Sequence, residues 1–170
     1  MESKLEIRES NVTFENICKS DYAPNDEKFR QANCLIIPYE NFRPGVEYCF
    51  SEYAQEVLEY SRDNPDLNMD IAATDDNYKV IELHSLLLQI GIFVATSVVL
   101  PVVVNVISEF VCDKIKKLHE KKENVEVRVT FISVSADGAS KQISYDGPAD
   151  KLETVINKIK ELSTDSDKES

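Results

Sequence analysis

The side chains that commonly perform chemistry are few in this sequence and stand far apart. The two histidines, His84 and His119, flank a long apolar segment, and no pattern typical of a Ser–His–acid triad surrounds either of them. Four glycines in the whole chain cannot supply a phosphate-binding loop. We therefore expect no catalytic residues, no cofactor and no enzymatic activity.

The four cysteines do not form a metal-binding pattern. Cys18, Cys34, Cys49 and Cys112 are irregularly spaced and include no Cys-x-x-Cys pair, which argues against a zinc site. The simplest interpretation is a set of reduced, mostly buried thiols. A second interpretation is palmitoylation of Cys112, because this residue follows the apolar segment and lies beside a group of lysines.

The charge of the chain points away from nucleic acid. The formal net charge is -12, and residues 1–83 carry eight Lys or Arg against eighteen Asp or Glu. A protein that binds nucleic acid has to neutralise phosphates with basic side chains, which this composition does not favour. An acidic surface suits solubility or docking to a basic protein partner.

The most conspicuous element is the uncharged segment 85–108, which is long enough to cross a membrane. A helix rises about 1.5 Å per residue and the hydrocarbon core is about 30 Å thick. The sequence thus predicts a membrane-spanning helix that begins at Ser85 and ends at Ser108. Pro101 would kink this helix or divide the segment. The alternative is a buried core helix, or two strands, of a soluble domain.

Other residues in or after the segment refine this prediction. Gly91 lies four residues before Ala95, a spacing compatible with helix self-association as well as with simple lipid packing. A basic anchor follows the span and consists of Lys114, Lys116, Lys117, Lys121 and Lys122. By the positive-inside rule, these lysines place the C-terminal half in the cytoplasm of a single-pass protein of the cell membrane.

The remaining pattern predicts an α+β fold in five parts. Residues 1–30 are polar and aperiodic and are expected to form a flexible arm. The pattern of residues 31–84 predicts a small β-α-β-β unit, whose helix covers 46–60. Residues 85–118 are expected to form the apolar helix, which ends in a lysine-rich segment. Residues 124–162 alternate as two strands around Asp137-Gly138 and then predict an amphipathic helix. The tail 163–170 is expected to be disordered.

Residues 85–162 resemble a known family. The order is an apolar helix, a lysine-rich exit (DKIKKLHEKK), a strand (VEVRV), the Asp137-Gly138 turn, a second strand (KQISYDG) and an amphipathic helix (LETVINKIKEL). This order resembles the effector-associated constant component family of bacterial conflict systems. The resemblance implies a companion protein encoded beside peptidase or other effector modules, and it implies no catalytic residue.

Three functional hypotheses follow. The first is a non-enzymatic, single-pass membrane-anchored adaptor that acts through a protein partner or self-association, as an accessory component of a bacterial defence or conflict system. The second is a soluble homo-oligomeric adaptor in which residues 85–111 form a buried central helix. The third is a membrane-perturbing effector that oligomerises through the same segment.

Overall fold

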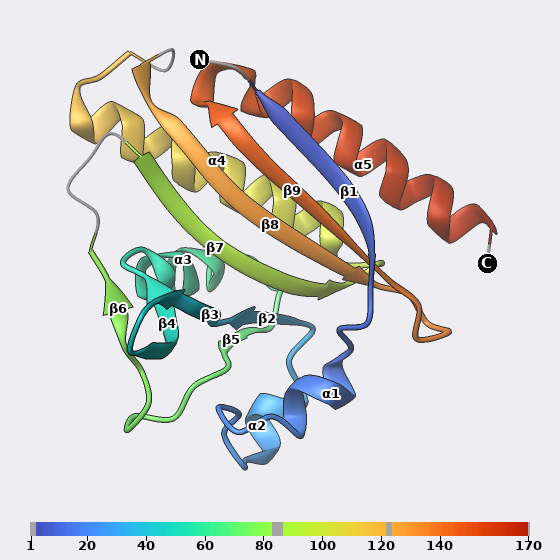
Figure 1. The fold of residues 1–170 in the computed structure, drawn as a ribbon. Helices are drawn as coiled ribbons and strands as arrows, with labels where there is room; N and C mark the ends of the chain where they lie inside the picture. The colour runs from blue at the N-terminus through green and yellow to red at the C-terminus, as the bar shows by residue number, and fades with distance from the viewer. Residues whose placement is uncertain (1–2, 83–86, 122–123, 170) are drawn as a thin grey trace.

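The structure, a computed structural model, describes residues 3–82, 87–121 and 124–169, which are arranged around a six-stranded mixed sheet (Figure 1). The strands lie in the order β1, β9, β8, β7, β2, β5. Their bounds are β1 Lys4–Ser10, β2 Cys34–Ile37, β5 Met69–Ile71, β7 Leu87–Thr96, β8 Glu126–Val134 and β9 Ser140–Pro148. The α+β class predicted from the sequence is confirmed, and strands from both ends of the chain share one sheet.

The apolar segment is not one helix, and the prediction of a membrane-spanning helix is wrong. Its first part forms β7, and the helix α4 (Leu100–Leu118) begins after a short turn. β7 pairs with β2 on one side and with β8 on the other, and parallel β8 is reached through α4. Among the residues that the structure describes, no helix combines the length and the apolar composition needed to cross a membrane.

The physical reason is that an interior strand is covered on both faces. Such a strand is apolar along its whole length and loses the alternation that normally identifies a strand. Leu88 and Phe93 of β7 face the core beneath α4, whereas Val94 faces a second cluster on the other side. Pro101 lies in the first turn of α4, where its missing N–H needs no partner. The proline therefore starts a helix and does not kink one.

Two helices cover one face of the large sheet and form the main core. α4 and α5 (Leu152–Glu169) both lie behind the sheet in the view of Figure 1. Beneath them, Phe93 and Phe131 are fully buried on neighbouring strands, with their ring centroids 6.0 Å apart. We call this side of the sheet the helix-covered face and the other side the open face.

A second, three-stranded sheet packs beside the first. It contains β3 (Tyr39–Arg43), β4 (Val46–Ser51) and β6 (Val80–Ile81), and α3 (Ala54–Ser61) follows β4. The predicted helix over 46–60 is therefore wrong in its first half. The turn at Gly45, with φ +81°, directs residues 46–51 back against β3, and this pairing overrides the helical spacing of their apolar side chains.

The N-terminal residues are structured, in contrast to the expected flexible arm. β1 pairs with β9 at the end of the large sheet, and two short helices follow, α1 (Phe14–Cys18) and α2 (Glu27–Arg30). The side chains of Thr13 and Asp26 cap these helices. Their apolar residues pack on one end of the open face, in a cluster that includes Ile17, Phe29, Leu35, Val94 and Ile132.

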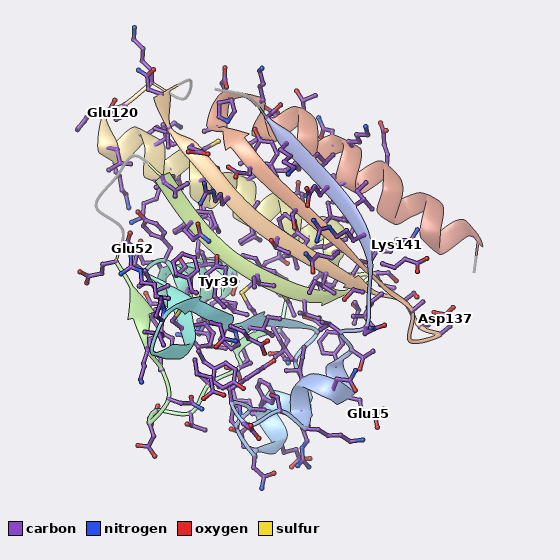
Figure 2. The ribbon with its side chains drawn as sticks, viewed as in Figure 1. Glu15, Tyr39, Glu52, Glu120, Asp137 and Lys141 are labelled. Atoms are coloured by element: carbon purple, nitrogen blue, oxygen red, sulfur yellow. The ribbon has the colours of Figure 1, made fainter. Side chains whose placement is uncertain are left out.

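The C-terminal hairpin agrees with the sequence pattern. β8 and β9 pair in antiparallel register, and Asp137 lies at the tip of their hairpin (Figure 2). The Asp137 carboxylate accepts hydrogen bonds from Ser135 and from the backbone of Ala139. A 3₁₀ turn (Ala149–Lys151) leads into α5, which continues to Glu169, beyond the expected end at residue 162.

Candidate functional site

The part of the open face that α1 and α2 do not cover is lined by polar side chains. Alternate residues of β1, β9 and β8 point to this side because side chains alternate along a strand. The register places Lys4 beside Asp146 and Asp146 beside Arg128, and Gln89 of β7 lies next in the same row. The sheet therefore presents a row of polar side chains that are far apart in sequence.

This surface is hollowed by a pocket of about 250 Å³. We call it the open-face pocket. Strands of the large sheet form its floor, and Tyr39 of β3 lines one side, where the small sheet meets β7 (Figure 2). The lining residues are Lys4, Glu6, Tyr39, Gln89, Gly91, Arg128, Val129, Thr130, Ser144, Tyr145 and Asp146.

A β-bulge in β7 shapes the floor of the pocket. The pairing with β8 shifts between Gln89 and Gly91, so that one residue of β7, Ile90, has no counterpart on β8. Gly91 has φ +141°, a conformation that residues with a side chain rarely adopt. The hydroxyl of Ser51 in β4 donates a hydrogen bond to the Gln89 carbonyl and ties the small sheet to this bulge. Bulges of this kind often re-aim a side chain beside a functional site.

The charged groups in and beside the pocket are organised around Arg128. Its Nε lies 3.0 Å from Oδ2 of Asp146, and its guanidinium lies 3.9 Å from Oε1 of Glu126. The neighbouring Asp146 carboxyl raises the pKa of Glu126, mainly through a shared hydrogen bond, while Arg128 acts in the opposite direction. At the edge of the pocket, Glu6 accepts from Lys4 at 2.8 Å.

Two acceptor oxygens in this pocket lack a partner. Oε1 of Gln89 and Oδ1 of Asp146 are buried, and neither accepts a hydrogen bond within the described part of the chain when Glu126 is ionised and so cannot donate to Asp146. Leaving such a group unsatisfied typically costs about 1–3 kcal/mol. By contrast, the hydroxyls of Thr130 and Ser144 contact each other at 3.2 Å. The pocket therefore offers two acceptors that a donor-bearing ligand would satisfy.

Tyr39 supplies a hydroxyl that stays protonated over the usual pH range. Burial raises the pKa of Tyr39 well above its ordinary value, and a hydrogen bond from the Gln89 side chain only partly offsets this effect. The group is thus a neutral hydroxyl. It cannot serve as a base near neutral pH.

The residues that marked the expected membrane span are not brought together as a site. Gly91 lies in the β7 bulge and lines the open-face pocket, and Pro101 starts α4. Ser108 lies half-buried within α4, and Ser85 lies outside the described residues. Of the four, only Gly91 belongs to the candidate site, for a reason unrelated to helix packing.

The lysines of the expected basic anchor differ in their surroundings. Lys114 lines a second pocket, of about 310 Å³, between α3 and α4, and its Nζ lies 2.5 Å from Oε2 of Glu56. The same ammonium lies 5.4 Å from the ring centroid of Tyr53. The others are exposed or lie outside the described residues: Lys116 and Lys117 are exposed in the last turn of α4, Lys121 is exposed after it, and Lys122 lies outside.

The cysteines lie apart from the open-face pocket. Cys34 and Cys49 are buried, and Cys18 and Cys112 are half-buried. Burial raises the pKa of the Cys34 thiol far above its ordinary value, which makes this thiol unreactive. The described residues contain no group of three or more His, Cys, Asp or Glu side chains placed to hold a metal ion.

Only part of the pocket can be predicted from the sequence. The alternation of Glu126, Arg128 and Thr130 with valines identifies a strand with one polar face. Nothing local connects this face to Tyr39 or Gln89, because three different strands of two sheets bring them together.

These features define an α+β protein with a polar pocket on one sheet face. No protein-family model, curated protein or solved structure matches the chain.

Proposed function

We propose that this chain is a non-enzymatic adaptor whose open-face pocket binds an extended segment of a protein partner through the partner's N–H donors. The observation that supports this proposal is the pair of buried acceptors without partners, Gln89 Oε1 and Asp146 Oδ1. A donor from the partner would satisfy each of them and recover the cost of leaving it unpaired.

The charges around the pocket favour an uncharged ligand group. Lys4 and Arg128 are balanced by Glu6 and Asp146, and the ion pairs already satisfy much of their charge. The two acceptors belong to strands separated by one other strand, so the backbone positions of Gln89 and Asp146 lie about 10 Å apart across the sheet. An extended peptide with successive backbone N–H groups spans such a distance, whereas a single amide does not.

The accessory role in a bacterial conflict system, which the family resemblance implies, is part of this proposal. The resemblance was drawn from an order that begins with an apolar helix, and β7 and α4 take its place in the structure. The order of strand, turn, strand and amphipathic helix over β8, β9 and α5 remains. An adaptor needs a partner-binding surface and no catalytic residue, which is consistent with this pocket.

The structure removes part of the support for the homo-oligomeric adaptor and for the membrane-perturbing effector. The homo-oligomeric adaptor requires residues 85–111 to form a central helix that is buried between copies of the chain. Within the single chain α4 already buries Val103, Val104 and Ile107 against the main core. The membrane-perturbing effector was inferred from a single apolar helix over 85–108, and β7 occupies the first part of this range.

A titration followed by two-dimensional NMR tests the proposal with defined probes. The first probe is blocked penta-alanine, and the second is the same peptide with every amide nitrogen methylated, so that it has the same carbonyls but no N–H donor. We expect the first peptide to shift the backbone resonances of Gln89, Arg128 and Asp146 in a saturable manner. The second peptide should leave them unchanged.

A pair of glutamine variants provides the control. Gln89→Leu removes the unpartnered acceptor and should abolish the shifts. Gln142→Leu changes a half-buried glutamine on the same open face, outside the pocket lining, and should preserve them. Equal responses to both peptides, no response to either, or full binding by Gln89→Leu would refute the proposal.

A further inference from the structure

The outer edge of β1 is an unpaired sheet edge. β1 is the terminal strand of the six-stranded sheet, and no described strand pairs with its outer side. Its seven residues pair with β9 in an unbroken register without a bulge, so the backbone groups of its outer side form a regular row. Such a row is a template for another strand unless the sequence prevents pairing.

The sequence of β1 is complementary to itself in one antiparallel register. When two copies of Lys4–Ser10 pair about Ile7, all seven residues of each strand have a counterpart. In this register Glu6 lies opposite Arg8 of the second copy, and the two-fold symmetry forms this pair twice. Opposite charges directly across a strand pair are favourable.

Neighbouring registers are disfavoured by the same side chains. A shift by two residues in one direction places Glu6 opposite Glu6 and Lys4 opposite Arg8, and a shift in the other direction places Arg8 opposite Arg8. A shift by one residue exchanges the two faces of the sheet. The charge pairs, together with the need to keep both open faces on one side of the joined sheet, therefore select the register centred on Ile7.

An exposed apolar residue lies where the two-fold axis would pass. Ile7 pairs with Ile143 of β9 and points to the helix-covered face, yet its side chain is 46% exposed. In the self-paired arrangement, the two copies of Ile7 cover each other on the face that carries α4 and α5. Leaving this side chain exposed gives up part of the stabilisation that burial of an isoleucine provides.

We propose that β1 is a self-association edge, through which two copies of this chain form one continuous antiparallel sheet centred on Ile7. The open faces of both copies then lie on the same side of the joined sheet. Lys4 and Glu6 line the open-face pocket and also belong to β1, so the two pockets come next to each other across the axis. This inference does not depend on what the pocket binds.

Charge reversal separates this interface from effects within one chain. In each chain Glu6 already contacts Lys4 and Arg8, so a single substitution also changes those contacts. Glu6→Arg places Arg opposite Arg in the homodimer, and Arg8→Glu places Glu opposite Glu. When the two variants are mixed, every Arg at positions 6 and 8 faces a Glu of the other chain, whereas the contact between residues 6 and 8 within each chain stays broken.

The mass in solution is measured by light scattering over a concentration series, with circular dichroism to verify folding. We expect the wild-type chain to dimerise, each single variant to lose at least about tenfold in dimer affinity, and the mixture to regain it as a heterodimer. Lys151→Glu makes the same change in net charge as Arg8→Glu, at an exposed site outside β1, and should dimerise like the wild type.

Three outcomes would overturn the proposal. They are a wild-type chain that stays monomeric throughout the series, single variants that dimerise as well as the wild type, and a mixture that shows no heterodimer. If a single variant fails to fold, Ile7→Lys, which places two like charges on the axis, replaces it and should also be monomeric.

Discussion

Val98 and Val99 are consecutive residues with opposite surroundings. The side chain of Val98 is 82% exposed, whereas that of Val99 is 6% exposed and belongs to the main core. Both lie between the end of β7 and the start of α4, where the Val99 N–H donates to the carbonyl of Thr96 at 3.1 Å. In a membrane-spanning helix both valines would lie near the middle of the apolar segment, so the difference between them is specific to this fold.

An arginine scan of this turn should therefore give very different results at neighbouring positions. Val98→Arg should change the free energy of unfolding by no more than about 0.5 kcal/mol, because its side chain is in solvent. Val99→Arg should lower it by about 2–4 kcal/mol, because a charge without a partner enters the core. Chemical denaturation measures both, and equal losses at the two positions would contradict this geometry.

Gly91 should resist substitution because of its backbone. At φ +141° an alanine is strained, although its Cβ would meet the Phe93 ring at an ordinary distance of 3.4 Å. We expect Gly91→Ala to lower the free energy of unfolding by about 1–3 kcal/mol and to shift the NMR signals of the pocket residues. Gly45→Asn is the control, because asparagine tolerates a positive φ and the turn has open space. A fully stable Gly91→Ala would argue against the bulge.

Lys114 should contribute more to stability than its neighbour Lys117. Its ammonium contacts Glu56 and two aromatic rings, and its side chain is 20% exposed. Lys114→Ala should lower the free energy of unfolding by about 1–2 kcal/mol. Lys117→Ala should change it by less than about 0.5 kcal/mol, because that residue is exposed. If both substitutions had the same effect in thermal or chemical unfolding, the role assigned to Lys114 would be wrong.

The carboxyl pair of Glu126 and Asp146 should leave a signature in the pH dependence of stability. The pKa of Glu126 is raised in the folded state, so the folded chain binds its proton more tightly than the unfolded chain. This contribution is complete below the ordinary value of 4.5 and is lost as pH rises through the raised pKa. The wild type should therefore lose stability, relative to Glu126→Gln, as pH rises above 4.5 toward neutrality.

Denaturation at a series of pH values measures this difference directly. Glu9→Gln removes an exposed carboxylate of β1 and serves as the control variant. A stability difference between Glu126→Gln and the wild type that stays constant, or that changes in the opposite direction with pH, would show that Asp146 does not raise the pKa of Glu126 in the folded chain.

The C-terminal hairpin illustrates what local sequence can predict. Val127, Val129 and Phe131 alternate with polar residues, and Asp137-Gly138 marks the turn. A strand with one covered face and a tight turn can each be recognised from a few consecutive residues. The pairing of β8 with β9 can therefore be predicted from local sequence. The apolar stripe of α5 is recognisable for the same reason.

The apolar segment illustrates the limit of this reasoning. Leu87 to Thr96 carries no periodicity, because β7 is covered on both of its faces and paired at both of its edges. A strand of this kind and a membrane helix have the same composition, and the residues that cover β7 come from α1, α2, α4 and neighbouring strands. The length of the segment and its lack of charge favour a helix, while Pro101 marks the true boundary.

By itself, the sequence determined the α+β class, the C-terminal hairpin, the amphipathic helix and an acidic chain without recognisable catalytic or metal-binding motifs. The tertiary structure decided the conformation of the apolar segment, the place of β1 at the sheet edge and the assembly of the open-face pocket. Gln89 and Asp146 lie far apart in the chain and are brought to one pocket by strand pairing in the large sheet, and Tyr39 joins them where the small sheet meets it. The periodicity of apolar residues indicates which side of an element is buried. It does not indicate which distant element covers that side, because this depends on tertiary packing.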